Sequence, residues 1–120
     1  MRTATYQRGD VLFAEIQFSG SIGRKRRPAV VLSVGAFHRA GSKLIVAGLT
    51  GTVSPPFRLG DVLIQDWQSA GLAKPSAMKN LITTVDRNEI VRVLGRLTPA
   101  DFANVEQGIA EVIGLRVAGP

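Results

Sequence analysis

The stretch GRKRRPAVVLS, residues 23–33, passes from four consecutive basic residues directly into a run of aliphatic ones. The segment Ala29 to Ser33 is typical of a central β-strand. Pro28 bars the preceding residue from the helical region, so Arg27 is held extended where a loop becomes a strand. Because small, flexible residues precede the basic run, the sequence predicts that Arg24 to Arg27 close a loop.

Short runs of similar character recur along the rest of the chain. The segments predicted as strands are 11–18, 44–47 with an end near Thr50, 62–64, 81–85 and 90–97. Turns rich in Gly and Pro separate them, which is the pattern of a small antiparallel barrel. The sequence therefore predicts a mainly β fold.

One helix is predicted near the C-terminal end. Thr98 is a favourable N-cap, Pro99 suits the first helical position, and Asp101 brings negative charge to the positive end of the helix. Gly114 offers a left-handed stop. The residues that form an apolar stripe at helical spacing are Phe102, Val105, Ile109, Val112 and Ile113. With no repeat or linker, residues 1–120 are predicted to be a single domain.

The charge distribution is uneven. The chain of 120 residues has 15 basic and 9 acidic side chains, a net charge of +6, yet no carboxylate lies between Glu15 and Asp61. Seven basic residues fall in that interval. A field of this kind attracts polyanions, so we predict a phosphate-binding surface; a merely solvated basic face is the alternative.

Composition also excludes several classes of protein. The absence of cysteine excludes disulfides, zinc–thiolate sites and thiol catalysis. No apolar run is long enough to cross a bilayer, and residues 1–10 do not resemble a signal peptide. We therefore expect a cytoplasmic protein that makes no membrane contact.

The residue types leave few catalytic mechanisms open. His38 is the single histidine, so a mechanism with two histidines within one protomer is excluded. The carboxylates are scattered, which argues against a metal-dependent nuclease, and no phosphate-binding glycine loop occurs. We expect neither metal nor cofactor. What remains is phosphate chemistry performed by arginine, or no chemistry.

Arg27 is the strongest catalytic candidate. When a ribose 2′-hydroxyl attacks its own 3′-phosphate, negative charge grows on the phosphoryl oxygens, and a guanidinium matches two of them. A preorganised donor of this kind is worth roughly 3–4 kcal/mol. The alternative is that Arg27 is only a solvated residue at the start of a strand. Arg24, Lys25 and Arg26 are predicted to contact neighbouring phosphates, and Lys74 and Lys79 are weaker candidates for the same groove.

Two further residues invite a functional interpretation but favour a plainer one. His38 follows a predicted turn and is expected to be a surface or turn residue rather than an acid or base. Trp67 could stack on a nucleobase, but its apolar neighbours favour packing.

Two ordered sets of motifs resemble the MazF/PemK family of type II toxins. The first set is Gly9-Asp10-Val11-Leu12, Arg27 to Ser33, Leu44 to Thr50, and Pro56-Phe57. The second set resembles a PemK-like branch: Asp66-Trp67, Ala70-Gly71-Leu72, Lys74-Pro75-Ser76 and Leu94-Gly95-Arg96-Leu97. The resemblance covers roughly residues 8–115.

The resemblance implies an SH3-like barrel of the CcdB/MazF type, usually a homodimer, with a C-terminal helix. It implies metal-independent cleavage of single-stranded RNA to 2′,3′-cyclic phosphate and 5′-hydroxyl ends. It also implies that an acidic antitoxin inhibits the toxin. The toxin would contact DNA only through this antitoxin. Arg27 takes the role of charge stabiliser and proton donor to the leaving oxygen, and Thr50 that of a hydrogen-bond donor to a phosphate oxygen.

The chain departs from that family pattern near the expected site. Gly51 stands where serine or threonine is frequent, and the loop before Arg27 has no acid, so a general base is not identified. A second hypothesis therefore stays open: a non-catalytic basic barrel that binds nucleic acid, or one that poisons a protein target such as gyrase, as the related CcdB-like barrel does.

Overall fold

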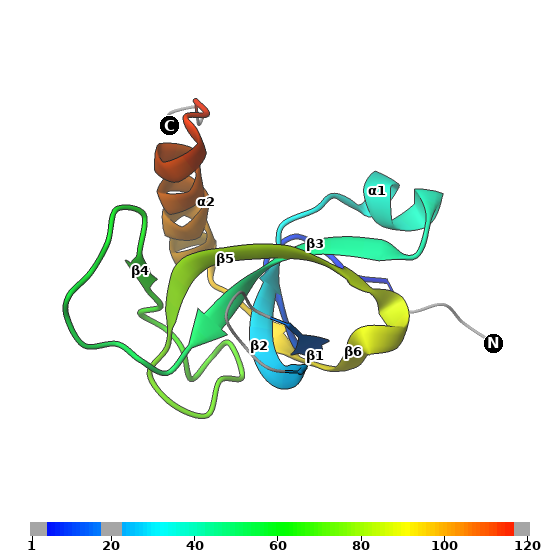
Figure 1. The fold of residues 1–120 in the computed structure, drawn as a ribbon, viewed down its shortest axis with the longest axis horizontal. Coiled ribbons are helices and arrows are strands. Elements are labelled where there is room, and N and C mark those ends of the chain that lie inside the picture. Colours follow the sequence, from blue (N-terminus) through cyan, green and yellow to red (C-terminus); the bar gives the residue numbers. More distant parts are fainter. Residues whose placement is uncertain (1–4, 18–22, 117–120) are drawn as a thin grey trace.

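The computed structural model describes residues 5–17 and 23–116 of the chain. Its strands are β1 (Asp10–Ile16), β2 (Lys25–Val31), β3 (Lys43–Thr50), β4 (Val62–Leu63), β5 (Ala77–Asp86) and β6 (Ile90–Arg96). Its helices are α1 (Gly35–Ala40), the 3₁₀ turn η1 (Arg87–Glu89) and α2 (Pro99–Ile113). The predicted mainly β fold with a C-terminal helix is confirmed (Figure 1).

All six strands belong to one sheet, in the order β4-β5-β3-β2-β1-β6. Every neighbouring pair is antiparallel. The sheet curls strongly, with the long strand β5 arching over β3 and β2 (Figure 1). Within the described residues, no helix is both long enough and apolar enough to pass through a membrane.

The two faces of the curled sheet bury two separate apolar clusters. Because successive side chains of a strand point to opposite faces, neighbouring residues enter different clusters. Val30 packs with Val105 of α2, whereas Val31 packs with Val46 on the other face. Trp67 packs against the cluster beneath α2, as its apolar neighbours predict.

Strand β2 begins at Lys25, so the expectation that residues 24–27 close a loop is wrong for three of those four residues. The cause is the hairpin with β1, whose register pairs Ile16 with Lys25, Glu15 with Arg26 and Ala14 with Arg27. The basic residues therefore extend a ladder, and consecutive ones point to opposite faces.

Strand β5 also begins earlier than predicted, at Ala77 rather than residue 81. Its register against β3 shifts between Ala47 and Leu49. Asn80 has a left-handed backbone, with φ of 59°, and its side-chain amide donates to the carbonyl of Gly60 at 2.6 Å. The bulge interrupts the strand pattern, which explains why only the second half was recognisable.

The ends of α2 form as predicted, with Asp101 in the first turn, and Asp101 has a second role as well. The Thr98 hydroxyl accepts from the backbone N–H of Asp101, and Gly114 adopts φ of 75°. The buried carboxylate of Asp101 accepts from the backbone N–H groups of Gln65 at 3.0 Å and Asp66 at 2.9 Å. It therefore attaches α2 to the segment after β4, a tertiary contact that helix spacing does not reveal.

The apolar stripe of α2 is core only in its first part. Val105 is completely buried, and Phe102 and Ile109 pack against the same cluster. Val112 and Ile113 are 46% and 53% exposed, so the prediction fails for the last turn. The last turn extends beyond the sheet, as Figure 1 shows for the upper end of α2.

Candidate functional site

Arg27 lies near the start of β2, where the hairpin places it on the face of Ala29 and Val31. Its side chain is half-buried. Pro28 follows it and pairs with Phe13 of β1, so the backbone at Arg27 is both extended and anchored. The side chain of Arg27 therefore extends from a fixed backbone position.

Thr50 is the last residue of β3, the strand next to β2. The ladder pairs Ala29 with Gly48, and continuing this register by two residues sets Arg27 opposite Thr50. Strand alternation places both side chains on one face. The Thr50 hydroxyl oxygen accepts from the N–H of Thr52 at 3.2 Å, which leaves the hydroxyl hydrogen to be donated.

Lys74 reaches the same place from the other neighbour of β3. It precedes β5, whose first residue Ala77 pairs with Thr50. The lysine side chain lies across Gly51: a methyl group built on that glycine would be 2.7 Å from Nζ and 3.1 Å from Cδ. Arg27 of β2, Thr50 of β3 and Lys74, which precedes β5, thus lie at the same end of three neighbouring strands. We refer to Arg27, Thr50 and Lys74 as the cation–hydroxyl site.

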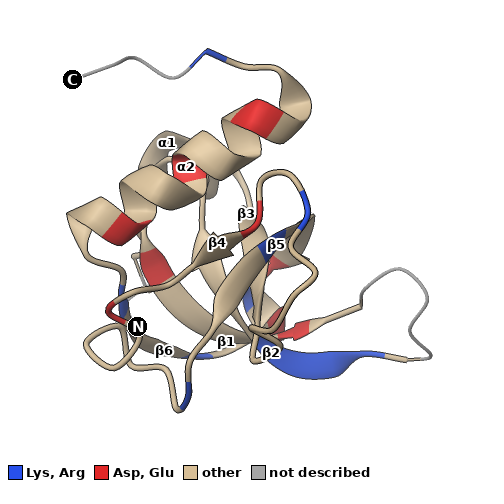
Figure 2. Cartoon of the chain, turned by 90° about the vertical axis from the view of Figure 1, so that its left-hand side faces the viewer, with Lys and Arg blue, Asp and Glu red and all other residues tan. Residues whose placement is uncertain are grey.

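The basic run beside this site is partly neutralised. Arg24 pairs with Glu89, and Arg26 pairs with Glu15 at 3.6 Å. Lys25 is exposed and shares the face of Arg27, while Arg26 lies on the opposite face. The segment without carboxylates is therefore not a single positive surface, because acids distant in sequence lie beside it. Figure 2 shows the basic start of β2 as a continuous blue stretch.

Lys79 does not join the cation–hydroxyl site. Its ammonium lies 3.1 Å from Asp61 and 4.9 Å from the centre of the Phe57 ring. Burial alone would raise the pKa of Asp61, but hydrogen bonds from the Arg58 N–H and from Lys79 hold that pKa below its ordinary value. Lys79 and Asp61 also line a hollow of about 380 Å³ with Thr52.

His38 is buried in α1, so the expectation of a surface or turn histidine is wrong. Nδ1 lies 3.1 Å from the carbonyl oxygen of Tyr6 and therefore donates to it. Nε2 lies 2.6 Å from the Ser33 hydroxyl oxygen, so both ring nitrogens have a hydrogen-bond partner.

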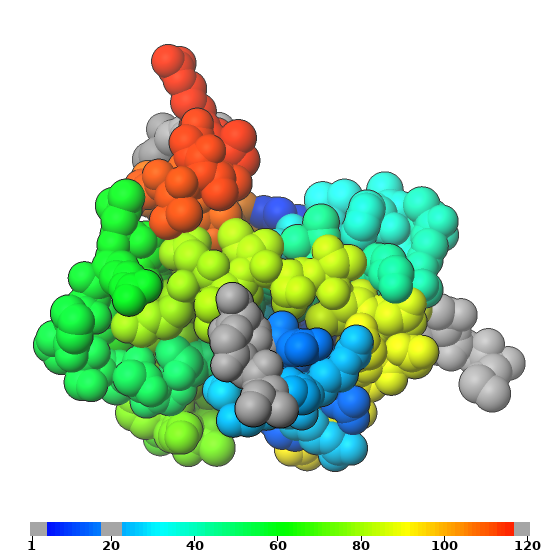
Figure 3. Space-filling view, viewed as in Figure 1, coloured from blue at the N-terminus to red at the C-terminus, as the bar shows by residue number. Residues whose placement is uncertain are grey.

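The position of His38 excludes it as a base for the cation–hydroxyl site. The hydroxyl oxygen of Ser33, which contacts His38, accepts from the backbone N–H of Ile45 at 2.9 Å. Ile45 is five residues from Thr50, or roughly 16 Å along an extended strand. Helix α1 and the loop after Thr50 lie at opposite sides of the molecule, with β5 between them (Figure 3).

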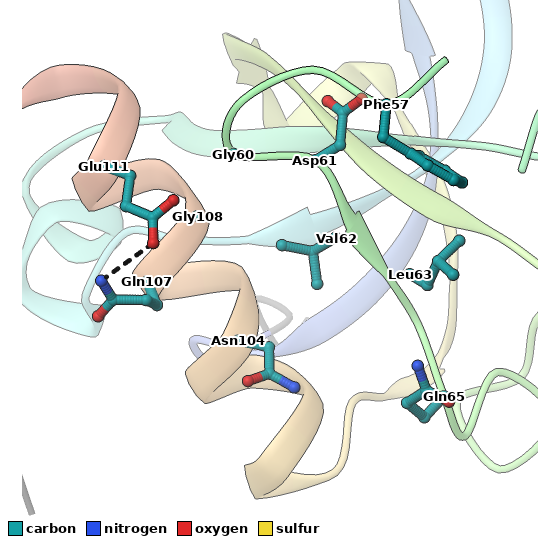
Figure 4. A pocket seen from close by; sticks show the side chains of 10 residues that line it. All are labelled: Phe57, Gly60, Asp61, Val62, Leu63, Gln65, Asn104, Gln107, Gly108 and Glu111. Carbon is teal, nitrogen blue, oxygen red and sulfur yellow. Dashed lines mark hydrogen bonds between the residues drawn. The ribbon is translucent and has the colours of Figure 1, made fainter. Parts of the chain in front are cut away.

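The described part of the chain has further hollows, and one of about 500 Å³ has Arg8 and Arg116 among its lining residues. One of about 460 Å³ separates α2 from β4, with Phe57 and Leu63 along one wall and Gln107 and Glu111 along the other (Figure 4). Among the described residues, no group of three or more His, Asp or Glu side chains could hold a metal ion.

The approach of Lys74 to Gly51 is the feature that sequence reasoning missed. Lys74 is a weaker candidate for the RNA groove in the sequence, and 23 positions separate it from Gly51. A usable signal exists in the sequence: Pro75 follows Lys74 just as Pro28 follows Arg27. Both cations are therefore held extended by the next residue.

Comparison with known proteins agrees with this fold. Residues 7–113 match the family model described as PemK-like, MazF-like toxin of type II toxin-antitoxin system. No curated protein matches the sequence significantly.

Several solved structures resemble the chain at low sequence identity. An endoribonuclease from a mycobacterial species has a TM-score of 0.75 and 18% identity, covering 98% of this chain and 100% of that one. A mycobacterial endoribonuclease in complex with its cognate antitoxin has a TM-score of 0.73 and 19% identity, covering 94% and 99%. The MazE–MazF complex of Deinococcus radiodurans (Form-II) has a TM-score of 0.72 and 16% identity, covering 95% and 100%.

Proposed function

Because the chain belongs to the PemK-like, MazF-like toxins of type II toxin–antitoxin systems, we propose that it is an endoribonuclease. Its substrate is single-stranded RNA, and it cuts without a metal ion. Cleavage leaves a 2′,3′-cyclic phosphate on one fragment and a 5′-hydroxyl on the other. Since RNA is the substrate, the protein acts in the cytoplasm.

One observation carries the proposal: Thr50 ends β3, the strand between β2, which holds Arg27, and β5, and Lys74 lies against the next residue, Gly51. A phosphodiester at this point meets positive charge from two sides and a hydroxyl donor between them. Such an arrangement suits a reaction in which charge accumulates on phosphoryl oxygens.

Arg27 stabilises the transition state. The 2′-oxygen of the substrate forms a bond to phosphorus while the bond from phosphorus to the 5′-oxygen breaks. The 2′-proton passes to solvent, the Arg27 guanidinium gives a proton to the leaving 5′-oxygen, and solvent then returns a proton to Arg27. A guanidinium that contacts the non-bridging oxygens contributes roughly 3–4 kcal/mol, as other preorganised donors do. Thr50 donates its hydroxyl hydrogen to one of these oxygens.

The rest of the RNA follows the start of β2. Lys25 contacts a neighbouring phosphate from the Arg27 face, and Arg24 and Arg26 exchange their carboxylate partners for phosphate. Lys79 already neutralises the buried Asp61, so we assign it to the loop after β3 rather than to RNA.

We propose a homodimer that binds a cognate acidic antitoxin. An acidic segment folding over the cation–hydroxyl site would compete with RNA for the same positive charge. DNA would be reached only through that antitoxin. Antitoxin complexes are present among the similar solved structures, and these complexes support the assignment of the partner.

The direct test uses purified protein, a single-stranded RNA library and EDTA. We expect fragments with 2′,3′-cyclic phosphate ends, and an Arg27→Ala rate lower by about 10²–10³. Arg39→Ala is the matched control, because Arg39 is exposed on α1, on the opposite side of the molecule from the loop after Thr50. An unchanged rate in Arg27→Ala would end the proposal.

Intact RNA in every reaction would also overturn it. A steep salt-dependent binding curve would then identify a nucleic-acid scaffold, whereas inhibited DNA supercoiling by gyrase would identify a poison of a protein target.

A further inference from the structure

We propose that Lys74 is a catalytic residue that contacts the same phosphate as Arg27 and Thr50, and that the absence of a side chain at Gly51 admits it. The inference rests on the proposed ribonuclease function. It adds a second cation to the reacting phosphate and names the residue that controls its position.

The space above Gly51 is occupied by the lysine itself. A methyl group on Gly51 would lie 2.7 Å from Nζ, 3.1 Å from Cδ and closer still to Cε of Lys74. Carbon atoms in normal contact are roughly 3.5–4.0 Å apart, so any side chain at position 51 would displace the lysine. Gly51 is not among the residues with positive φ, so its backbone gives no reason of its own for glycine.

The Thr50 hydroxyl bends over the same glycine. Its oxygen accepts from the N–H of Thr52, so this hydrogen bond spans Gly51. The hydroxyl and the ammonium therefore lie against one residue, from two neighbouring strands. A phosphate that accepts from the Thr50 hydroxyl is within reach of the Lys74 ammonium.

The backbone of Lys74 is anchored, which makes its side chain a positioned group rather than a loose one. Pro75 holds Lys74 extended. The Ser76 hydroxyl donates to the Lys74 carbonyl at 2.9 Å, and the Ser76 carbonyl accepts from Ile64 at 2.9 Å. The turn is thus tied to the segment after β4.

The charge of Lys74 is available to a ligand. In residues 5–17 and 23–116, it takes part in none of the ion pairs, whereas Lys43 and Lys79 are each paired with an aspartate. An ammonium beside the Thr50 hydroxyl therefore has no carboxylate to exchange before it binds phosphate.

A double-mutant cycle tests the inference. Single-turnover cleavage is measured for wild type, Lys74→Met, Gly51→Ala and the double variant. We expect Lys74→Met to cleave about 10- to 100-fold more slowly than wild type. This loss of rate is smaller than that for removal of a fully buried donor, because the lysine is exposed. Gly51→Ala should also be slower, and in the Lys74→Met background it should have no further effect.

Two additional measurements separate catalysis from structure. Lys74→Arg should recover part of the rate, and thermal unfolding of all variants should match wild type. Salt dependence is measured with an RNA that has 2′-deoxyribose at the cut site. For this RNA, the slope of log K against log[salt] should be smaller in magnitude by about 0.7 in Lys74→Met than in wild type. Arg39→Met, which removes an exposed cation from α1, should leave the cleavage rate unchanged.

Independent, multiplicative effects of Gly51→Ala and Lys74→Met would overturn the inference, as would wild-type cleavage by Lys74→Met. In either case, a rate that still depends on Arg27 would leave the ribonuclease function intact. Loss of the Arg27 dependence would remove both proposals together.

Discussion

The hydroxyl of Ser33 lies 2.6 Å from Nε2 of His38, and both residues are buried between β2, α1 and β3. The same hydroxyl oxygen accepts from the backbone N–H of Ile45, and Nδ1 of the histidine donates to the Tyr6 carbonyl. His38 therefore connects the segment before β1 to the sheet.

Replacing His38 with alanine should destabilise the protein without affecting catalysis. The substitution leaves the Tyr6 carbonyl and the Ser33 hydroxyl without their partner, and we expect a loss of roughly 2–4 kcal/mol in the free energy of unfolding. Urea unfolding measures the loss, and cleavage per folded molecule should be unchanged. A stable variant that no longer cuts RNA would instead make His38 catalytic.

Asp101→Ala should detach α2 from the segment after β4. The two N–H groups of Gln65 and Asp66 would lose their acceptor, and a hydrogen bond to a charged group contributes roughly 1.5–3 kcal/mol. We therefore expect a loss of roughly 2–4 kcal/mol in thermal or urea unfolding. Glu111→Ala, at an exposed position of the same helix, is the control and should change stability little. Equal stability of the two variants would contradict the prediction.

Asp86 should contribute to acid sensitivity. The Ser42 hydroxyl, the Asn88 N–H and Lys43 lower its pKa from 3.8 to about 2. Because the folded-state pKa is depressed, the stabilisation is fully present above the unfolded value near 3.8 and is lost as the pH falls toward 2. Asp86→Asn should therefore flatten the stability profile between pH 4 and about 2. An identical profile in urea unfolding would refute this.

Lys25 and Lys79 should differ in their effect on RNA binding. Lys25→Gln removes an exposed cation on the Arg27 face, so the slope of log K against log[salt] should fall by about 0.7. Lys79→Gln removes the partner of the buried Asp61, so unfolding should become easier while the slope stays constant. Fluorescence anisotropy with an uncut RNA analogue measures both slopes. Equal slope changes in the two variants would show that Lys79 also contacts RNA.

Local patterns in the sequence were sufficient where a short segment determines its own conformation. The α2 cap at Thr98 and the left-handed end at Gly114 follow from neighbouring residues, and the structure has both. The extended backbone at Arg27 is likewise a consequence of the following proline. Signals of this range predict strands and helices, but not which side chains meet.

The positions of the basic residues illustrate the limit. In the sequence, residues 24–27 form one block, yet strand alternation separates Arg26 from Arg27, and Glu89 neutralises Arg24 from a distant turn. His38 looked like a turn residue because its distant partner Tyr6 is brought to it only by the fold.

The sequence by itself determined a basic, mainly β chain with a C-terminal helix and an arginine held at a strand entrance, because turn, cap and strand preferences depend on adjacent residues. Only the tertiary structure decided that Lys74, 23 positions further on, lies across Gly51 beside Thr50. The physical reason is that β3 pairs with both β2 and β5, and this pairing brings three distant segments to one end of the sheet.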